Sequence, residues 1–224
     1  EKVISKKKVN EVIQYINKKK IYNSSQEVFA NKTYKINNFK KDQSSYFCLN
    51  LDDSLNTFNK LNLTNNNKIK NIIKNYFFKK KPSVFSINVM INKAGKLNMD
   101  IQNFHRDFDS VDTLVLMILL TDVNKSNGAT QVIKSSQYND YSKYKNKKIL
   151  KKNMKNLSGN AGDVILLDNF VLHKGNPNFK NIKYMIWCRL SYQYSLMYYM
   201  TNMYLSKKKL LKIKFLKMNE LLDT

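Results

Sequence analysis

The stretch NFHRDFD, residues 103–109, contains one of the only two histidines in the chain, His105, and an aspartate two positions later, Asp107. In an extended segment, residues i and i+2 point to the same side and lie roughly 6–7 Å apart along the strand. The imidazole and the carboxylate are therefore expected to converge on one point. The other histidine, His173, follows an apolar stretch much later in the chain.

A second imidazole beside this pair would complete a set of two nitrogens and one oxygen. Such a set occupies one face of a metal ion and leaves the opposite positions open, as in non-haem iron(II) oxygenases. Each part alone has an ordinary explanation, because a His–Asp pair is more often a hydrogen-bonded structural pair and a lone histidine at a strand end is usually satisfied locally. Together, at the ends of predicted strands and beside turns, His105, Asp107 and His173 favour a functional site.

The composition describes a globular protein with one core. The chain has 224 residues, 42% hydrophobic and 12% aromatic, which suits a single domain over residues 1–224. The formal charge is +24, from 40 basic and 16 acidic residues, and Arg106 and Arg189 are the only arginines. Because nucleic-acid readers favour arginine for bidentate contacts, we favour coding bias as the source of the charge and keep nucleic acid only as an alternative partner.

The two cysteines, Cys48 and Cys188, form no motif and lie in apolar surroundings, so both are expected to be buried free thiols. The longest apolar run, residues 114–120, is too short to cross a bilayer. The first residues lack the apolar core of a signal peptide. We therefore expect a cytoplasmic protein without a membrane span, and the sequence leaves its oligomeric state open.

The N-terminal part, residues 1–82, is expected to be a mainly helical scaffold. Apolar residues recur at helical spacing in residues 2–20 and 51–78, and a short strand is expected at residues 46–49. A polar side chain at the start of the second helical segment can cap it. The candidates for this cap are Asp52, Asp53 and Ser54.

From residue 83 onward, short strands alternate with turns. The strands are rich in β-branched and aromatic residues, and Asn127-Gly128 is the strongest turn signal between them. Many short strands with helices before and after predict a mainly β (α+β) fold, with an antiparallel jelly-roll core over residues 83–195 and a C-terminal helix over residues 196–224. The predicted strands are residues 83–91, 113–121, 129–133, 164–173 and 184–194.

Several segments of this region keep a characteristic order: QNFHRD at 102–107, LLTDV at 119–123, NGATQVI at 127–133, GDVILLD at 162–168, and HKG at 173–175 with Asn178. In order and spacing they resemble the phytanoyl-CoA dioxygenase-like family of iron(II)/2-oxoglutarate-dependent oxygenases. The resemblance runs from Phe85 to Tyr194. One departure follows the strand at 129–133, where the family usually reads Pro-Gly-Ser-His and this chain reads KSSQ, residues 134–137.

The resemblance implies a double-stranded β-helix, the cupin-like form of the jelly roll, with His105, Asp107 and His173 as ligands of Fe(II). It also implies 2-oxoglutarate as cosubstrate, O2 as oxidant, and hydroxylation of a C–H bond with release of succinate and CO2. Related halogenases have a small residue in place of the carboxylate, so Asp107 favours hydroxylation. The expected substrate is a small molecule, and the excess of lysine is consistent with an anionic one.

The family holds the distal carboxylate of 2-oxoglutarate with a cation that follows the second histidine, usually an arginine. Lys183 is ten positions after His173, and Arg189 lies six positions further on. Both share one face of the predicted strand. Because two inward cations are costly without an anion, we favour Lys183 as the partner of the cosubstrate and keep Arg189 as the alternative. A third reading makes both of them rim charges that reach solvent.

Two other classes of function stay open at this point. One is a non-catalytic jelly-roll module that binds nucleic acid or an anionic glycan through its lysine-rich surface. The other is a nucleic-acid demethylase, which also uses a His-x-Asp pair and a distal histidine. We rank the demethylase lower because the chain lacks arginine-rich segments that could handle a base.

Overall fold

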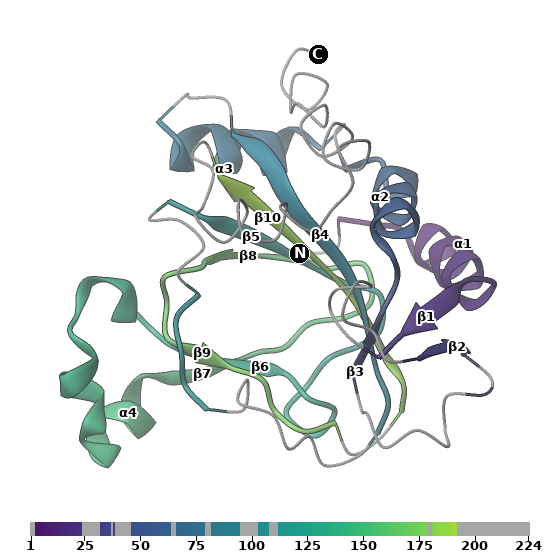
Figure 1. The fold of residues 1–224 in the computed structure, drawn as a ribbon. Helices are drawn as coiled ribbons and strands as arrows, with labels where there is room; N and C mark the ends of the chain where they lie inside the picture. Colours follow the sequence, from purple (N-terminus) through teal and green to yellow (C-terminus); the bar gives the residue numbers. More distant parts are fainter. Residues whose placement is uncertain are drawn as a thin grey trace.

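The computed structural model describes residues 3–23, 32–36, 38, 46–63, 66–78, 82–94, 103–107, 112–178 and 181–191. Its strands are β1 (Lys20–Tyr22), β2 (Thr33–Lys35), β3 (Tyr46–Cys48), β4 (Ser83–Asn92), β5 (Leu114–Leu119), β6 (Thr130–Ile133), β7 (Met154–Leu157), β8 (Val164–Asp168), β9 (His173–Lys174) and β10 (Lys183–Ser191). Seven strands form one antiparallel sheet, in the order β2-β1-β3-β4-β10-β5-β8, and three form a second, in the order β7-β6-β9 (Figure 1).

The helices are α1 (Lys6–Asn17), α2 (Leu51–Lys60), α3 (Asn67–Tyr76) and α4 (Lys147–Asn153), with short 3-10 helices η5 (Ser136–Tyr138) and η6 (Tyr141–Lys145) before α4. Helices α1 to α3 lie along the large sheet, and α4 lies beyond the small one (Figure 1). The N-terminal part also supplies β1 to β3, which extend the large sheet. The predicted C-terminal helix over residues 196–224 falls outside the described residues. None of the helices in the described part of the chain is long and apolar enough to cross a membrane.

The start of α2 corrects one prediction. Its cap is Asn50, whose side chain accepts a hydrogen bond from the Asp53 N–H at 2.8 Å. Asp52, Asp53 and Ser54 are therefore not the cap, because all three already lie inside the helix. The two aspartates occupy its first turn, where the helix dipole stabilises negative charge.

β10 lies at the centre of the large sheet, between β4 and β5, and its side chains alternate between two cores. One core fills the space between the large sheet and helices α1 to α3. The other fills the space between the two sheets and includes Met185 and Trp187 of β10 with Val132 of β6. The strand is therefore buried on both faces, and Leu114–Leu119 of the neighbouring β5 is likewise buried throughout.

The single strand predicted over residues 164–173 is wrong, because the chain changes sheets there. β8 ends at Asp168, whose side chain accepts a hydrogen bond from the Phe170 N–H at 2.9 Å. The Val171 N–H donates to the Asp168 carbonyl at 3.1 Å, which closes a turn. β9 then begins at His173 in the small sheet. This turn carries the second histidine away from the large sheet and onto the opposite wall of the interior.

Both cysteines are buried free thiols, as predicted. Burial raises the pKa of Cys48 to about 12, so this thiol stays protonated at neutral pH. Burial also raises the pKa of Cys188. Each side chain therefore packs as a small apolar group.

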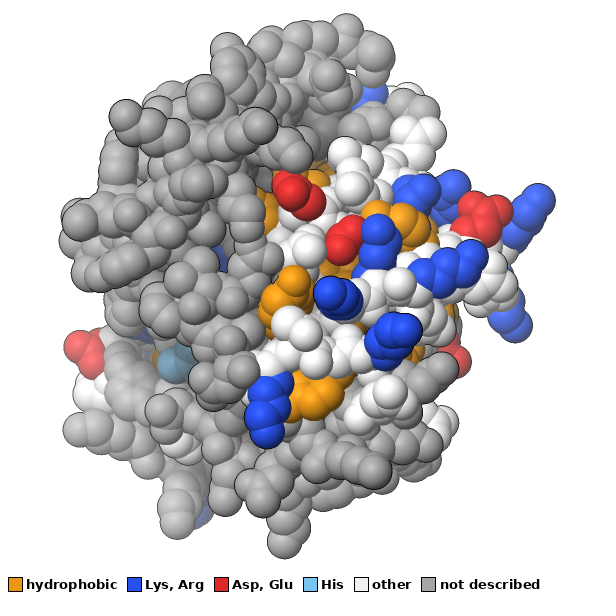
Figure 2. Space-filling model, turned by 45° about the vertical axis from the view of Figure 1, so that its right-hand side comes forward, with side chains coloured by type: hydrophobic (Ala, Val, Ile, Leu, Met, Phe, Trp, Pro, Cys, Tyr) orange, Lys and Arg blue, Asp and Glu red, His pale blue; other side chains and the backbone are white. Residues whose placement is uncertain are grey.

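Lysine side chains spread over the surface of α1 and α2, together with several carboxylates (Figure 2). Two ion pairs lie on this surface, Lys8–Glu11 at 3.0 Å and Lys19–Asp53 at 2.8 Å. The ammonium groups of Lys19 and Lys60 also lie over the ring of Tyr15, at 4.6 and 4.8 Å from its centroid. A solvent-exposed pair such as Lys8–Glu11 contributes little to stability. Positive and negative charges are therefore interspersed on this surface, and the Lys19–Asp53 pair is partly buried.

Candidate metal centre

The backbone places the two histidines directly opposite each other. The His105 N–H donates to the His173 carbonyl and the His173 N–H donates to the His105 carbonyl, both at 2.9 Å. His173 is also paired with Val132 of β6, so the small sheet supports this bridge. The two imidazole rings consequently lie side by side, with their centroids 4.5 Å apart.

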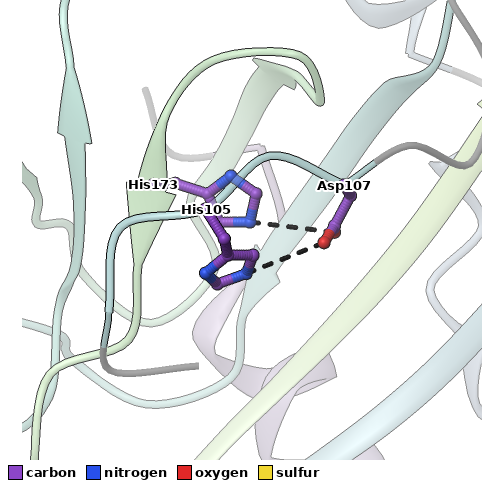
Figure 3. Close-up of side chains that lie close together, drawn as sticks. All are labelled: His105, Asp107 and His173. Carbon is purple, nitrogen blue, oxygen red and sulfur yellow. Dashed lines mark ion pairs between the residues drawn. The ribbon is translucent and has the colours of Figure 1, made fainter. Parts of the chain in front are cut away.

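Asp107 completes the cluster (Figure 3). The His105 Nε2 lies 3.7 Å from Asp107 Oδ1, and the His173 Nε2 lies 3.7 Å from Asp107 Oδ2. The three ligand atoms lie within 4.8 Å of one another. Separations of this size suit donor atoms that share one ion, since protein ligands approach a transition metal to about 2.0–2.2 Å. The structure thus brings together all three residues that the sequence proposed as ligands.

The other ring nitrogen of each histidine already has a partner. His105 Nδ1 lies 2.8 Å from the Asn103 carbonyl, and His173 Nδ1 lies 2.9 Å from the Val171 carbonyl. A carbonyl can only accept, so each Nδ1 carries a proton, and the neutral form of each ring then has its lone pair on Nε2, on the side of Asp107. Burial also lowers the pKa of His173, which favours the neutral ring. A metal needs neutral imidazoles with this orientation, so the donor set fits a metal ion.

Arg189 lies against the carboxylate of this cluster. Its Nη2 donates to Asp107 Oδ2 at 3.2 Å, and its guanidinium lies 5.5 Å from the ring centroid of Trp187, two positions earlier on β10. A charge-assisted hydrogen bond of this kind restrains the carboxylate more strongly than a neutral one would. The side chain of Arg189 is 20% exposed and directed toward Asp107, so this cation contacts the cluster as well as solvent.

Lys183 lies on the same face of β10 but has a different partner. Its Nζ donates to the Gly128 carbonyl at 2.6 Å, and the residue is 7% exposed. Burial lowers the pKa of Lys183 from 10.5 to about 8. No carboxylate in the described ranges forms an ion pair with this ammonium, which has three donors and uses one of them on Gly128. A bound anion would therefore satisfy both its charge and its remaining donors.

The Asn127-Gly128 turn gives this ammonium its space. Gly128 has a φ of +86°, a conformation that L side chains rarely adopt. A Cβ at this position would lie 3.2 Å from the Lys183 Nζ and 3.0 Å from the Asn176 carbonyl oxygen. The predicted turn is confirmed, and its glycine also leaves room beside the buried cation.

Sequence reasoning missed two residues near the cluster, Arg106 and Ser136. Arg106 stands between two of the candidate ligands, and its Nη2 donates to the carbonyls of Ser136 and Asn139, both at 2.6 Å. Ser136 belongs to the segment where the chain departs from Pro-Gly-Ser-His. The residue before it, Ser135, has a left-handed backbone with a φ of +60°, where the family pattern has glycine. The serine at position 135, in place of the family's glycine, was the feature of the sequence that could have drawn attention to this segment.

Two antiparallel sheets around a His–Asp–His cluster define a cupin-like jelly roll of the type found in iron- and 2-oxoglutarate-dependent oxygenases. The family model described as phytanoyl-CoA dioxygenase (PhyH) matches residues 8–180, and the chain belongs to this family. Among curated protein sequences, none matches the chain.

Solved structures show the same fold, with 139 matching chains. HygX from Streptomyces hygroscopicus, with nickel and 2-oxoglutarate bound, has a TM-score of 0.56 at 8% identity, over 85% of this chain and 80% of HygX. The epimerase SnoN, in complex with Fe3+, α-ketoglutarate and nogalamycin RO, has a TM-score of 0.56 at 14% identity, over 84% of this chain and 76% of SnoN. In another SnoN structure the match spans only 60% of that chain.

The carbocyclase SnoK from nogalamycin biosynthesis has a TM-score of 0.52 at 14% identity, over 72% of this chain and 70% of SnoK. An epimerase and a carbocyclase therefore share the fold, so the fold alone does not select a reaction. The mainly β fold with a double-stranded β-helix core, predicted from the motif order, is confirmed. The family resemblance is confirmed as well.

Proposed function

We propose that this protein is an iron(II)- and 2-oxoglutarate-dependent dioxygenase that hydroxylates a C–H bond of a small molecule, with release of succinate and CO2. The observation that carries the proposal is the convergence of the His105, Asp107 and His173 ligand atoms within 4.8 Å. Such a set leaves the opposite coordination positions for the cosubstrate and O2. The ligands named for HygX and SnoN, a metal ion with 2-oxoglutarate or α-ketoglutarate, support the same chemistry here.

Iron(II) and 2-oxoglutarate bound at this centre would supply the oxidative decarboxylation and the transfer of oxygen to the substrate. The protein's own task is to hold and orient these groups. His105 and His173 would present their Nε2 lone pairs, since both Nδ1 atoms are held by carbonyls. Asp107 would take the position that a halide needs in related halogenases, which supports hydroxylation over halogenation.

Lys183 is our candidate for holding the distal carboxylate of 2-oxoglutarate. A dicarboxylate would give this buried ammonium the anion that it lacks among the described residues. Arg189, the alternative, already pairs with Asp107 at 3.2 Å. We therefore propose that Arg189 orients the ligand carboxylate and that Lys183 binds the cosubstrate. No specific observation favours the nucleic-acid demethylase or the binding module.

The proposal can be tested without knowledge of the substrate, by measuring uncoupled turnover of 2-oxoglutarate. Purified protein with 2-oxoglutarate, iron(II), ascorbate and O2 is expected to form succinate and CO2, and an excess of a chelator is expected to stop the reaction. A folded, iron-loaded protein that forms no succinate above a chelated control would contradict the proposed function.

A further inference from the structure

Ser136 is a fully buried serine that contacts the segment before the second histidine. Its exposed fraction is 0%, and its Oγ accepts a hydrogen bond from the Leu172 N–H at 2.7 Å. Leu172 immediately precedes His173 and is itself buried. The serine hydroxyl thus holds the backbone in place just before the start of β9.

The carbonyl of the same serine contacts the segment of the other two ligands. Arg106, between His105 and Asp107, donates from Nη2 to the Ser136 carbonyl at 2.6 Å. The same Nη2 donates to the Asn139 carbonyl, and the guanidinium lies 4.9 Å from the ring centroid of Phe170. Two carbonyls and one aromatic ring therefore fix the direction of Arg106, and with it the backbone that carries Asp107.

These contacts close a ring of hydrogen bonds around the metal centre. The Ser136 hydroxyl accepts from the Leu172 N–H, and the next residue, His173, is hydrogen-bonded to His105 through the backbone. Arg106, which follows His105, donates to the Ser136 carbonyl and closes the ring. Every candidate ligand is a member of this ring or the neighbour of one. The spacing between the two ligand-bearing segments is consequently set at two places, by the His105–His173 bridge and by Ser136.

The backbone before Ser136 is held in an unfavourable conformation. Ser135 has a φ of +60°, a region that residues with a side chain rarely enter because it is sterically unfavourable. Its carbonyl accepts a hydrogen bond from Asn139 Nδ2 at 2.8 Å, which helps to keep it there. Such strain persists only where the surrounding contacts require it, which indicates that the placement of Ser136 matters.

We propose that Ser136, acting with Arg106, is a positioning residue that sets the distance and angle between His173 and the His105–Asp107 pair. This inference rests on the proposed metal site, and neither residue is assigned a direct contact with the metal. Partners that orient metal ligands typically change metal affinity by about 10–100-fold when they are removed. Loss of the Ser136 hydroxyl should therefore weaken metal binding even though all three ligands remain.

The experiment compares metal binding by four proteins: the wild type, Ser136→Ala, Arg106→Met and Ser54→Ala. Arg106→Met keeps an apolar stem over Phe170 and removes the donors. Ser54→Ala is the matched control, because Ser54 is also buried, at 1% exposed, and its Oγ has no hydrogen-bond partner within the described part of the chain. Anaerobic titration with Co2+ gives the dissociation constant and the ligand-field absorption bands, and thermal melting of the metal-free proteins reports stability.

We expect Ser136→Ala and Arg106→Met to bind Co2+ about 10–100-fold more weakly than the wild type, with shifted bands, and Ser54→Ala to bind as the wild type does. Folded Ser136→Ala with unchanged affinity and bands would overturn the inference, whatever its melting temperature. If Ser136→Ala does not fold, Arg106→Met decides by the same criteria. A wild type that binds no Co2+ would instead overturn the metal site itself, and this inference with it.

Discussion

Alternate side chains of β10 enter two different environments. Those that pack toward helices α1 to α3 lie in an apolar core: Tyr184, Ile186, Cys188 and Leu190. Those that point into the interior between the sheets include two cations: Lys183, Met185, Trp187 and Arg189. One strand therefore contributes apolar burial on one face and charged groups on the other. Burial of apolar surface stabilises a fold, whereas burial of an ammonium or a guanidinium costs free energy unless an anion pairs with it.

This contrast between the two faces favours a ligand-binding role for the interior face. Arg189 pairs with the anion of Asp107, at 3.2 Å, whereas among the described residues Lys183 has only the Gly128 carbonyl as a hydrogen-bond partner, at 2.6 Å. Substitutions on the two faces should consequently separate stability from ligand binding.

Removal of an interior metal ligand should abolish function and leave the fold intact. His173→Ala deletes one of the two Nε2 donors, and we expect iron-dependent succinate formation to fall to background. The backbone bridge to His105 uses main-chain atoms and survives the substitution, so the melting temperature of the metal-free protein should stay close to that of the wild type. Succinate assays and thermal melts check both points. Wild-type turnover in the folded variant would show that His173 is not a metal ligand.

Truncation on the helix-facing side should have the opposite effect. Ile186 is 0% exposed in the core beneath the helices, and Ile186→Ala should lower the free energy of unfolding by about 2–5 kcal/mol through lost contacts and a cavity. At a temperature where the variant is folded, its affinity for iron and 2-oxoglutarate should match the wild type. Urea denaturation and ligand titration measure the two quantities. A large loss of affinity in the folded variant would show that the two faces are not independent.

Lys183→Met tests the buried cation. The substitution removes the ammonium and keeps an apolar side chain of similar length, so affinity for 2-oxoglutarate should fall about 10–100-fold, the equivalent of a lost charge-assisted hydrogen bond. Affinity for iron alone should not change. Lys155→Met, at an exposed position on β7, is the control and should behave as the wild type. Equal 2-oxoglutarate affinity in the two variants would show that another cation holds the distal carboxylate, with Arg189 the next candidate.

The same lysine should make stability depend on pH. Below about pH 8, Lys183 is charged in both the folded and the unfolded state, and the full cost of burying the charge is present. As the pH rises from about 8 toward 10.5, the folded state loses this proton first, so the unfolded state binds more protons and stability rises.

Relative to Lys183→Met, the metal-free wild type should therefore gain about 2–3 kcal/mol between about pH 7 and about pH 10. Urea denaturation of both proteins at the two pH values measures the gain, and the many exposed lysines contribute equally to both. A constant difference would mean that the ammonium is not charged and buried as described.

Several parts of the fold and of the site could be predicted from the sequence. The alternation of apolar residues predicted β10 and the face shared by Lys183 and Arg189, because a strand has a period of two. The rarity of histidine made His105 and His173 conspicuous, and the structure places them side by side. These features depend on local pattern and composition, which a single sequence carries.

The remaining features depend on contacts between distant segments. Residues 164–173 look like one apolar strand, and only the hydrogen bonds around Asp168 show that the chain turns and changes sheets. Likewise, alternation predicts which face of the strand carries Arg189, but it does not predict the partner Asp107, which lies 82 positions earlier in the chain. The hydrogen bond between Leu172 and Ser136 joins residues 36 positions apart, and no periodicity of the sequence predicts it.

The central claim is that one iron ion and one molecule of 2-oxoglutarate bind at the His105–Asp107–His173 cluster. An anaerobic titration with iron(II), followed by 2-oxoglutarate, tests it most directly. We predict that one equivalent of iron is retained and that 2-oxoglutarate then produces a weak visible charge-transfer band, which is absent in His173→Ala. A folded wild type that retains no iron and gives no band, but binds oligonucleotides with a steep dependence on salt, would contradict it and favour a non-catalytic binding module.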